Sequence, residues 1–210
     1  PSPATPSSTT PFRVPGIDGL RAIAVGAVVV YHLGPGVLQG GFLGVDLFFV
    51  ISGFLITALL LRERASTGRV RLGAFWLRRV RRLVPALVLL LLACGAAATV
   101  LGGDLTLHLG SQVLGALTFS SNWLFIAQGA DYFTSASPDL FRNLWSLAVE
   151  EQFYLVWPFV VLALALVPRA VRAVAIAALA AGSAVGMALL DTTGAATRVY
   201  FGTDTHSFGL

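Results

Sequence analysis

The sequence predicts an all-α, polytopic transmembrane helical bundle. Of its 210 residues, 56% are hydrophobic and only 11% are charged, whereas an ordinary soluble domain carries about 25% charged residues. Hydrophobic segments recur along the chain, and each is close to the roughly 20 residues that cross about 30 Å of hydrocarbon. Because helices satisfy all their backbone hydrogen bonds internally, they are the expected element in a bilayer.

The elements follow one another in a simple order. Residues 1–12 are rich in Pro, Ser and Thr and carry no charge, which is typical of a disordered cytoplasmic tail and not of a signal peptide. Residues 13–210 are expected to form the N-terminal part of an integral-membrane domain that is truncated at its C-terminus, with the start of a seventh helix at 202–210. Six spans are predicted, the fourth being the weakest: 20–38, 42–61, 83–102, 107–127, 146–167 and 173–190.

The distribution of arginine indicates the orientation. All 14 basic residues are arginines, and eight lie between Arg62 and Arg82, in the predicted loop between the second and third spans. The positive-inside rule places this loop and the N-terminus in the cytoplasm. Arg169 and Arg172 favour a cytoplasmic loop after the fifth span, whereas simple alternation puts it outside. Either residues 107–127 do not fully cross the membrane or the weak charge bias misleads, so sidedness after the third span stays open. The net charge of +4 does not indicate nucleic-acid binding, because no module for it is present.

Arg21 and His32 lie in the first predicted span. Eleven positions at 100° each bring them to within about 20° of one helical face, roughly 16 Å apart along the axis. An ionisable side chain deep in the membrane is a functional candidate by default. The alternative is that Arg21 reaches the lipid headgroups and His32 bonds a neighbouring helix.

Four arginines stand just before the third predicted span: Arg78, Arg79, Arg81 and Arg82. Topogenic charge alone would explain them. Four guanidinium groups at a helix entrance can also hold an anion, and a cytosolic phosphorylated donor such as a nucleotide-containing thioester would suit this site.

Two glutamates open the fifth predicted span. Glu150 shares a helical face with Ser146, and Glu151 is turned about 100° away. Two carboxylates that enter an apolar helix must be protonated, paired or solvated by a cavity. They are therefore candidates to orient a substrate or a histidine, and an interfacial cap is the alternative.

Other polar residues are weaker candidates. Asp46 and Ser52 lie in the second span. Close helix packing explains Ser52, and a position near the outer interface would lower the free-energy cost of placing the Asp46 carboxylate there. Cys94 is the only cysteine, which rules out a disulfide framework and a zinc spacing. His108 is interpreted as structural.

Taken together, these segments resemble the acyltransferase-3 family of membrane O-acyltransferases. Each match alone is modest, but four in order and at the family's spacing are highly specific, and they cover residues 15–160 densely. Two departures are Asn143, where the family often has histidine, and His206, where many members have arginine in an Asp-Thr-Arg pattern. The four matches are Asp18-Gly19-Leu20-Arg21 with His32, Gly44 to Thr57, Arg79 and Arg82 before Pro85, and Trp145 to Tyr154.

The resemblance implies transfer of an acyl group, commonly acetyl, from cytosolic acyl-CoA to a hydroxyl of an extracytoplasmic or lipid-linked glycan. It implies a multi-pass protein of the cell membrane, surrounded by lipid, without a metal, and in some members followed by a further C-terminal domain. His32 would act as general base or transient acyl carrier, Arg21 would hold the thioester or stabilise negative charge, and the four arginines would bind coenzyme A phosphates. Glu150 completes the catalytic set, with these supporting residues: Asp18, Asp46, Ser52, Trp145, Ser146, Glu151 and Tyr154.

Two other classes of protein fit less well. A proton-coupled transporter also needs intramembrane His, Glu, Asp and Arg, but such proteins often show an internal repeat of broken helices, and we find none in the sequence. A membrane anchor for a partner would have no need of His32 or Glu150.

Overall fold

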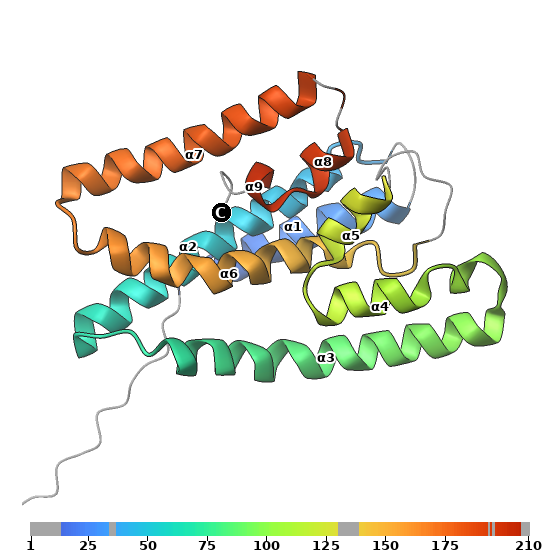
Figure 1. Ribbon diagram of the computed structural model, residues 1–210. Helices are drawn as coiled ribbons and strands as arrows, with labels where there is room; N and C mark the ends of the chain where they lie inside the picture. The colour runs from blue at the N-terminus through green and yellow to red at the C-terminus, as the bar shows by residue number, and fades with distance from the viewer. Residues whose placement is uncertain (1–13, 34–36, 130–138, 193, 195, 207–210) are drawn as a thin grey trace, which may run out of the picture. The chain divides into compact units, whose positions relative to one another are not determined.

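A computed structural model describes residues 14–33, 37–129, 139–192, 194 and 196–206 (Figure 1). These residues form helices and connecting turns, and no strand occurs among them. The chain divides into two compact units, residues 1–51 and residues 52–210. The predicted tail at 1–12 lies outside the described residues.

Unit 1 contains α1 (Ile17–Leu33), the short 3-10 helix η1 (Gly41–Leu43) and the first part of α2 (Gly44–Thr67). Two glycines allow η1 and the start of α2 to approach α1 closely. A Cβ atom on Gly41 would lie 2.8 Å from Cβ of Tyr31 and collide with the Ala27 carbonyl oxygen, and one on Gly44 would lie 2.9 Å from Cγ2 of Val28. Backbone contact between these elements therefore requires glycine at both positions.

Unit 2 contains the rest of α2 and all later helices. Figure 1 shows α6 running through the middle of this unit, with α3 and α4 along one side. Its other elements are α3 (Leu72–Leu101), η2 (Gly103–Thr106), α4 (Leu109–Leu117), α5 (Ser121–Gln128), α6 (Leu144–Leu164), α7 (Arg169–Thr192), α8 (Ala196–Phe201) and α9 (Thr203–His206).

The prediction of a transmembrane helical protein is confirmed. Within the described part of the chain, four helical segments are long and apolar enough to cross a membrane: Gly41–Thr67, Leu72–Leu101, Leu144–Leu164 and Arg169–Thr192. The predicted number of six spans is not confirmed. α1 has 17 residues, which corresponds to about 25 Å, slightly less than the hydrocarbon thickness.

The predicted span at 107–127 is wrong, because this segment forms two short helices. α4 has 9 residues and α5 has 8, and each covers less than half of the hydrocarbon core. The chain turns between them at Phe119, whose φ is 51°, and the hydroxyl of Thr118 donates to the Leu114 carbonyl over 2.7 Å. A Cβ atom on Gly115 would lie only 3.3 Å from Cα of Ser121 in α5, so glycine at this position lets the two short helices approach closely. The apolar composition that indicated a span belongs to a packed helical hairpin.

The predicted arginine loop between the second and third spans is shorter than the sequence indicated. α2 continues to Thr67 and α3 begins at Leu72, so only Arg69 and Arg71 lie between helices. α3 has 30 residues and is therefore about 45 Å long, about 15 Å longer than the hydrocarbon core. Arginine is a good helix former, so the basic segment extends α3 as helix in place of forming a loop.

The turn between α6 and α7 gives a structural role to an arginine that the sequence suggested as topogenic. Arg172 donates from Nε to the Leu164 carbonyl over 2.9 Å and from Nη2 to the Val167 carbonyl over 3.3 Å. The last carbonyls of a helix lack partners within the helix, and a cation at this end also interacts favourably with the helix dipole. Arg172 therefore caps α6.

Candidate functional site

Helix α6 carries the Trp145–Tyr154 segment and lies at the centre of the contacts in unit 2. Trp145, Glu150 and Tyr154 are all buried there, at 2%, 8% and 3% exposure. Its polar side chains contact four different helices, as the following paragraphs describe. The segment that the sequence selected for its chemistry is also the segment that joins the helices of this unit.

Glu150 is joined to α2 by a hydrogen bond. The hydroxyl of Ser52 donates to Oε1 of Glu150 over 2.6 Å. A carboxyl group buried among apolar helices is costly without such a partner. Ser146, which shares a helical face with Glu150, instead donates to the Asn143 carbonyl of its own helix over 3.3 Å. The hydroxyl that donates to Glu150 therefore comes from a residue for which the sequence favoured close helix packing and the resemblance implied only a supporting role.

A second polar contact joins α6 to α2 further along both helices. The indole Nε1 of Trp157 donates to Oγ1 of Thr57 over 2.7 Å. The Trp157 ring also stacks on Phe153, with ring centroids 4.9 Å apart. Two hydrogen bonds therefore connect these helices, about two turns apart on α6 and about one and a half turns apart on α2.

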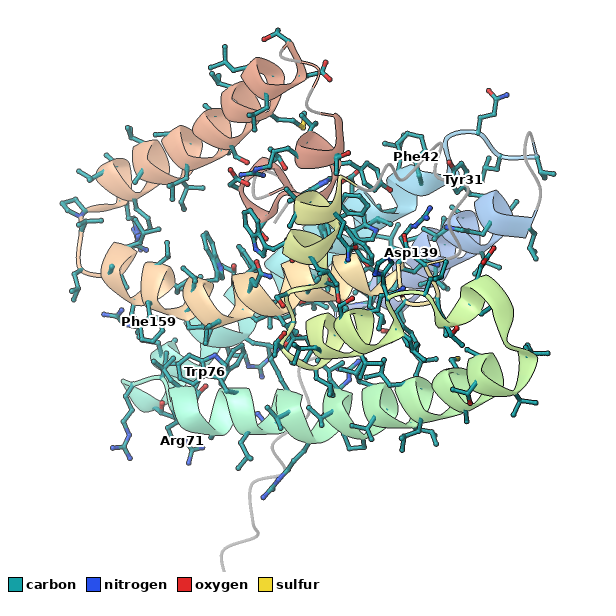
Figure 2. The ribbon with its side chains drawn as sticks, turned by 45° about the vertical axis from the view of Figure 1, so that its right-hand side comes forward. Tyr31, Phe42, Arg71, Trp76, Asp139 and Phe159 are labelled. Carbon is teal, nitrogen blue, oxygen red and sulfur yellow. The ribbon has the colours of Figure 1, made fainter. Side chains whose placement is uncertain are left out.

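Pro158 creates an acceptor in α6 that a side chain of α3 uses. Proline has no N–H, so the carbonyl of Tyr154, four residues earlier, loses its partner within the helix. The indole Nε1 of Trp76 donates to this carbonyl over 3.1 Å. Figure 2 shows Trp76 beside Phe159, and their ring centroids are 5.6 Å apart. The missing N–H of Pro158 in α6 thus explains why the Trp76 indole of α3 donates a hydrogen bond to the Tyr154 carbonyl.

This pairing predicts an effect that depends on the proline. Trp76→Phe should destabilise the protein by about 1 kcal/mol, the typical net contribution of a hydrogen bond. In a Pro158→Ala background the same change should cost clearly less, because the alanine backbone would supply the missing N–H to the Tyr154 carbonyl. Thermal unfolding of the four proteins in detergent measures the difference. Equal costs in both backgrounds would contradict the pairing.

The four predicted arginines of α3 divide into two kinds. Arg79 is half-buried, and its Cζ atom lies 3.3 Å from the ring centroid of Tyr154 and 5.5 Å from that of Phe75. Its Nε lies 3.8 Å from Oε1 of Glu151. The other three side chains are exposed: Arg78, Arg81 and Arg82. One arginine therefore contacts α6, and the other three are exposed.

A half-buried polar network that sequence reasoning missed surrounds Gln152. Its Nε2 donates to the Phe119 carbonyl over 2.7 Å and to Oδ1 of Asn122 over 2.9 Å. Its Oε1 accepts from the indole of Trp123 over 3.0 Å and from the hydroxyl of Thr203 over 2.6 Å. We call these residues the Gln152 network. It joins α6 to the hairpin of α4 and α5 and to α9, and a glutamine inside an apolar helix was the only signal that the sequence offered for it.

The helices α8 and α9 pack on Trp145. The rings of Tyr200 and His206 lie 4.9 and 5.4 Å from that of Trp145. Nε2 of His206 lies 2.6 Å from the Tyr200 carbonyl, so the imidazole donates a hydrogen bond to it. The His206 that departs from the family's pattern therefore has a buried structural position. Asn143, the other departure, is exposed.

Arg198 and Asp204 pair at the surface of the same region. Their Nη2 and Oδ2 atoms are 2.7 Å apart, and this hydrogen bond lowers the pKa of Asp204 below its usual value. The guanidinium also lies over the Trp123 ring, 5.0 Å from its centroid. A Cβ atom on Gly202 would collide with Arg198, so only glycine fits there.

Arg21 and His32 belong to unit 1, on one continuous helix, as predicted. The Arg21 guanidinium lies over the Phe48 ring at 5.0 Å. His32 is exposed, and its Nδ1 lies 2.8 Å from the Val28 carbonyl one turn earlier. Asp18 and Asp46 lie in the first turns of α1 and α2, where negative charge is favoured by the helix dipole.

Within the described residues, no group of three His, Cys, Asp or Glu side chains is placed to hold a metal ion. Cys94 is a half-buried free thiol beside the cluster of Leu87, Leu91 and Ala116. It packs as a small apolar side chain.

The apolar helices and the four motif segments define a membrane acyltransferase domain. Residues 14–202 match the acyltransferase domain of the acyltransferase-3 family, and the chain belongs to that family. No solved structure matches it significantly.

Three curated relatives are similar over most of the chain. O-acetyltransferase OatA of Staphylococcus aureus (strain NCTC 8325 / PS 47) is 42% identical over 202 residues, which are 93% of this chain and 33% of that protein. YrhL of Bacillus subtilis (strain 168), with the proposed name peptidoglycan O-acetyltransferase, is 43% identical over 94% of this chain and 32% of its own length. SACOL0978 of S. aureus (strain COL), a proposed O-acetyltransferase, is 43% identical over 91% and 32%. The chain thus spans about a third of the length of these relatives.

Proposed function

We propose that this chain is part of a membrane O-acyltransferase that moves an acyl group, acetyl in the first instance, from acyl-CoA to a hydroxyl group. The observation that carries the proposal is the match of residues 14–202 to the acyltransferase-3 family. Relatives that align over nine-tenths of the chain are named O-acetyltransferases, which supports an oxygen acceptor.

The geometry of His32 supports a role as general base. A carbonyl oxygen only accepts hydrogen bonds, so the contact with Val28 requires the proton of neutral imidazole to be on Nδ1. The lone pair is then on Nε2. This atom would take the proton of the acceptor hydroxyl while its oxygen attacks the thioester carbonyl, and the departing thiolate of coenzyme A would take that proton in turn. Attack by Nε2 on the thioester, with brief acyl transfer to the ring, is the other route.

The exposed arginines of α3 support the choice of donor. Arg78, Arg81 and Arg82 lie within about 100° of one another around the helix axis, and all three are exposed. They lie in the first 11 residues of the 30-residue helix α3, and we expect this charged end to be the part that extends beyond the hydrocarbon core, where a water-soluble nucleotide can reach them. Guanidinium groups bind phosphate oxygens in a planar, bidentate manner, so the phosphates of coenzyme A fit this surface.

The acceptor and the orientation follow from weaker observations. The name of YrhL refers to peptidoglycan, which supports a glycan of the cell envelope or a lipid-linked sugar as acceptor. The positive-inside rule places the arginine-bearing end of α3 and the N-terminus in the cytoplasm. An acyl group would then pass from a cytoplasmic donor to an acceptor at the membrane or beyond it.

The proposal is tested by acyl transfer in membranes that contain the complete protein. Radiolabelled acetyl-CoA is added, and label that mild alkali releases is counted, because an O-ester is alkali-labile and an amide is not. We expect alkali-labile label above that of membranes without the protein. Incorporation that resists mild alkali, or no incorporation, would contradict an O-acyltransferase.

A further inference from the structure

We propose that Arg79 is a positioning residue that holds α3 against α6, and that it does not bind the donor. The assignment of the donor to the other three arginines rests on the proposed function. The coupling of Arg79 to α6 does not.

The first observation is that Arg79 is already occupied by α6. Its guanidinium carbon is 3.3 Å from the Tyr154 ring centroid, which places the cation on the face of the ring. Its Nε lies 3.8 Å from the Glu151 carboxylate. The Arg79 and Glu151 side chains are only 20% and 14% exposed. A phosphate group would have to displace this pair before it could reach the guanidinium.

The second observation is the direction in which the four side chains leave the helix. Arg78, Arg81 and Arg82 fall on one arc of the α3 surface, whereas Arg79 lies about 60° beyond Arg82. Arg79 is thus at one edge of the set, and it is the edge that contacts Tyr154 and Glu151 of α6. Four neighbouring arginines therefore serve two surfaces, and their sequence proximity does not make them one site.

The third observation is that Arg79 acts on the same residue as Trp76. Trp76 donates to the Tyr154 carbonyl, and Arg79 covers the Tyr154 ring. Trp76 and Arg79 both belong to α3. On α6, Glu150 is adjacent to Glu151 and accepts a hydrogen bond from Ser52 of α2. A change in the Arg79 contact would therefore shift the end of α3 that bears the exposed arginines relative to Glu150.

Arginine is required at this position for a physical reason. A planar guanidinium can stack on an aromatic ring while one edge faces a carboxylate. The compact ammonium group of lysine keeps the charge but cannot do both. Arg79→Lys should therefore behave like Arg79→Ala and not like wild type.

The test separates donor affinity from turnover. Coenzyme A binding to the purified complete protein, and kcat and KM for acetyl transfer per folded molecule, are measured for Arg79→Ala, Arg79→Lys, Glu151→Gln and the double variant Arg79→Ala/Glu151→Gln. Arg81→Ala and Arg82→Ala are the comparison, and Arg71→Ala is the control, because its exposed pair with Glu63 should contribute little.

We expect the two groups to separate. Arg79→Ala should change the Kd for coenzyme A less than about twofold and lower kcat about tenfold, which a merely structural role would not do once values are corrected for folded protein. The double variant should be no worse than Arg79→Ala, because both changes remove one interaction. Arg81→Ala or Arg82→Ala should raise Kd about tenfold or more, the cost of a lost charged hydrogen bond.

Two results would overturn the inference. One is a rise in Kd for Arg79→Ala equal to that for Arg82→Ala, which would make Arg79 a donor ligand. The other is an additive effect in the double variant, which would remove the link to Glu151. If no arginine variant changes coenzyme A binding, the donor assignment fails, and the double variant still decides the role of Arg79.

Discussion

Replacing His32 with alanine should lower acyl transfer by about 100- to 10,000-fold, the range expected for loss of a general base. The protein should still fold and insert. His32 is exposed, so truncation of its side chain removes little buried surface. His32→Gln should be equally inactive, because a glutamine amide has no basic nitrogen. Single-turnover transfer from radiolabelled acetyl-CoA in membranes measures the rate.

His108 offers a matched control for this experiment. It is also exposed, and its φ of 53° lies in the left-handed region that asparagine tolerates well. His108→Asn should therefore retain full transfer. Transfer at the wild-type rate by correctly inserted His32→Ala would remove His32 from the chemistry, whatever the family resemblance implies.

Replacing Gln152 with leucine should destabilise unit 2 by about 2–4 kcal/mol. Gln152 makes four hydrogen bonds, to Phe119, Asn122, Trp123 and Thr203. Interhelical bonds in membranes average about 0.6 kcal/mol and those in soluble proteins about 1 kcal/mol, and four of them give this range. Leucine has no polar atom, so all four partner groups lose their hydrogen bond to residue 152. Thermal unfolding in detergent measures the change.

Gln128 provides the control, because it is an exposed glutamine at the end of α5. Gln128→Leu should change stability by less than about 0.5 kcal/mol, as is usual for a surface site. An equal effect of the two changes would show that the Gln152 network contributes nothing specific. A loss of activity without loss of stability in Gln152→Leu would contradict a purely structural role.

The sequence predicted the class of fold because that class depends on local composition. Segments of about 20 apolar residues indicate membrane helices wherever they occur, and all-α architecture is confirmed. The arginine bias left open that residues 107–127 do not fully cross, but the hairpin of α4 and α5 was not predicted, for the same reason. The composition of a segment does not indicate that the chain turns at Thr118 and Phe119. A packed helical hairpin can also be as apolar as a membrane span.

The candidate site was predictable as residues but not as contacts. Glu150 and Arg79 were identified from their charge in or beside an apolar helix. Their partners lie far away in sequence, as Ser52 does from Glu150 at 98 positions. Trp76 and Tyr154 are 78 positions apart, and only the missing N–H of Pro158 explains why they meet. The catalytic roles, the donor and the acceptor stay predictions.

The cluster of arginines in α3 can be explained in two physical ways. Charge near the end of an apolar helix predicts orientation, and it also predicts phosphate binding. Neither argument separates Arg79 from Arg82, because both look only at sequence proximity. The contacts of Tyr154 and Glu151 make the distinction.

Transfer in sealed vesicles of known orientation tests the central claim most directly. Radiolabelled acetyl-CoA does not cross the bilayer, so it reaches only the outward-facing side of each vesicle. If the arginine-bearing end of α3 binds the donor from the cytoplasm, inverted vesicles should form alkali-labile O-acetyl label and right-side-out vesicles should not. Equal labelling from both orientations, or labelling from right-side-out vesicles alone, would contradict the account.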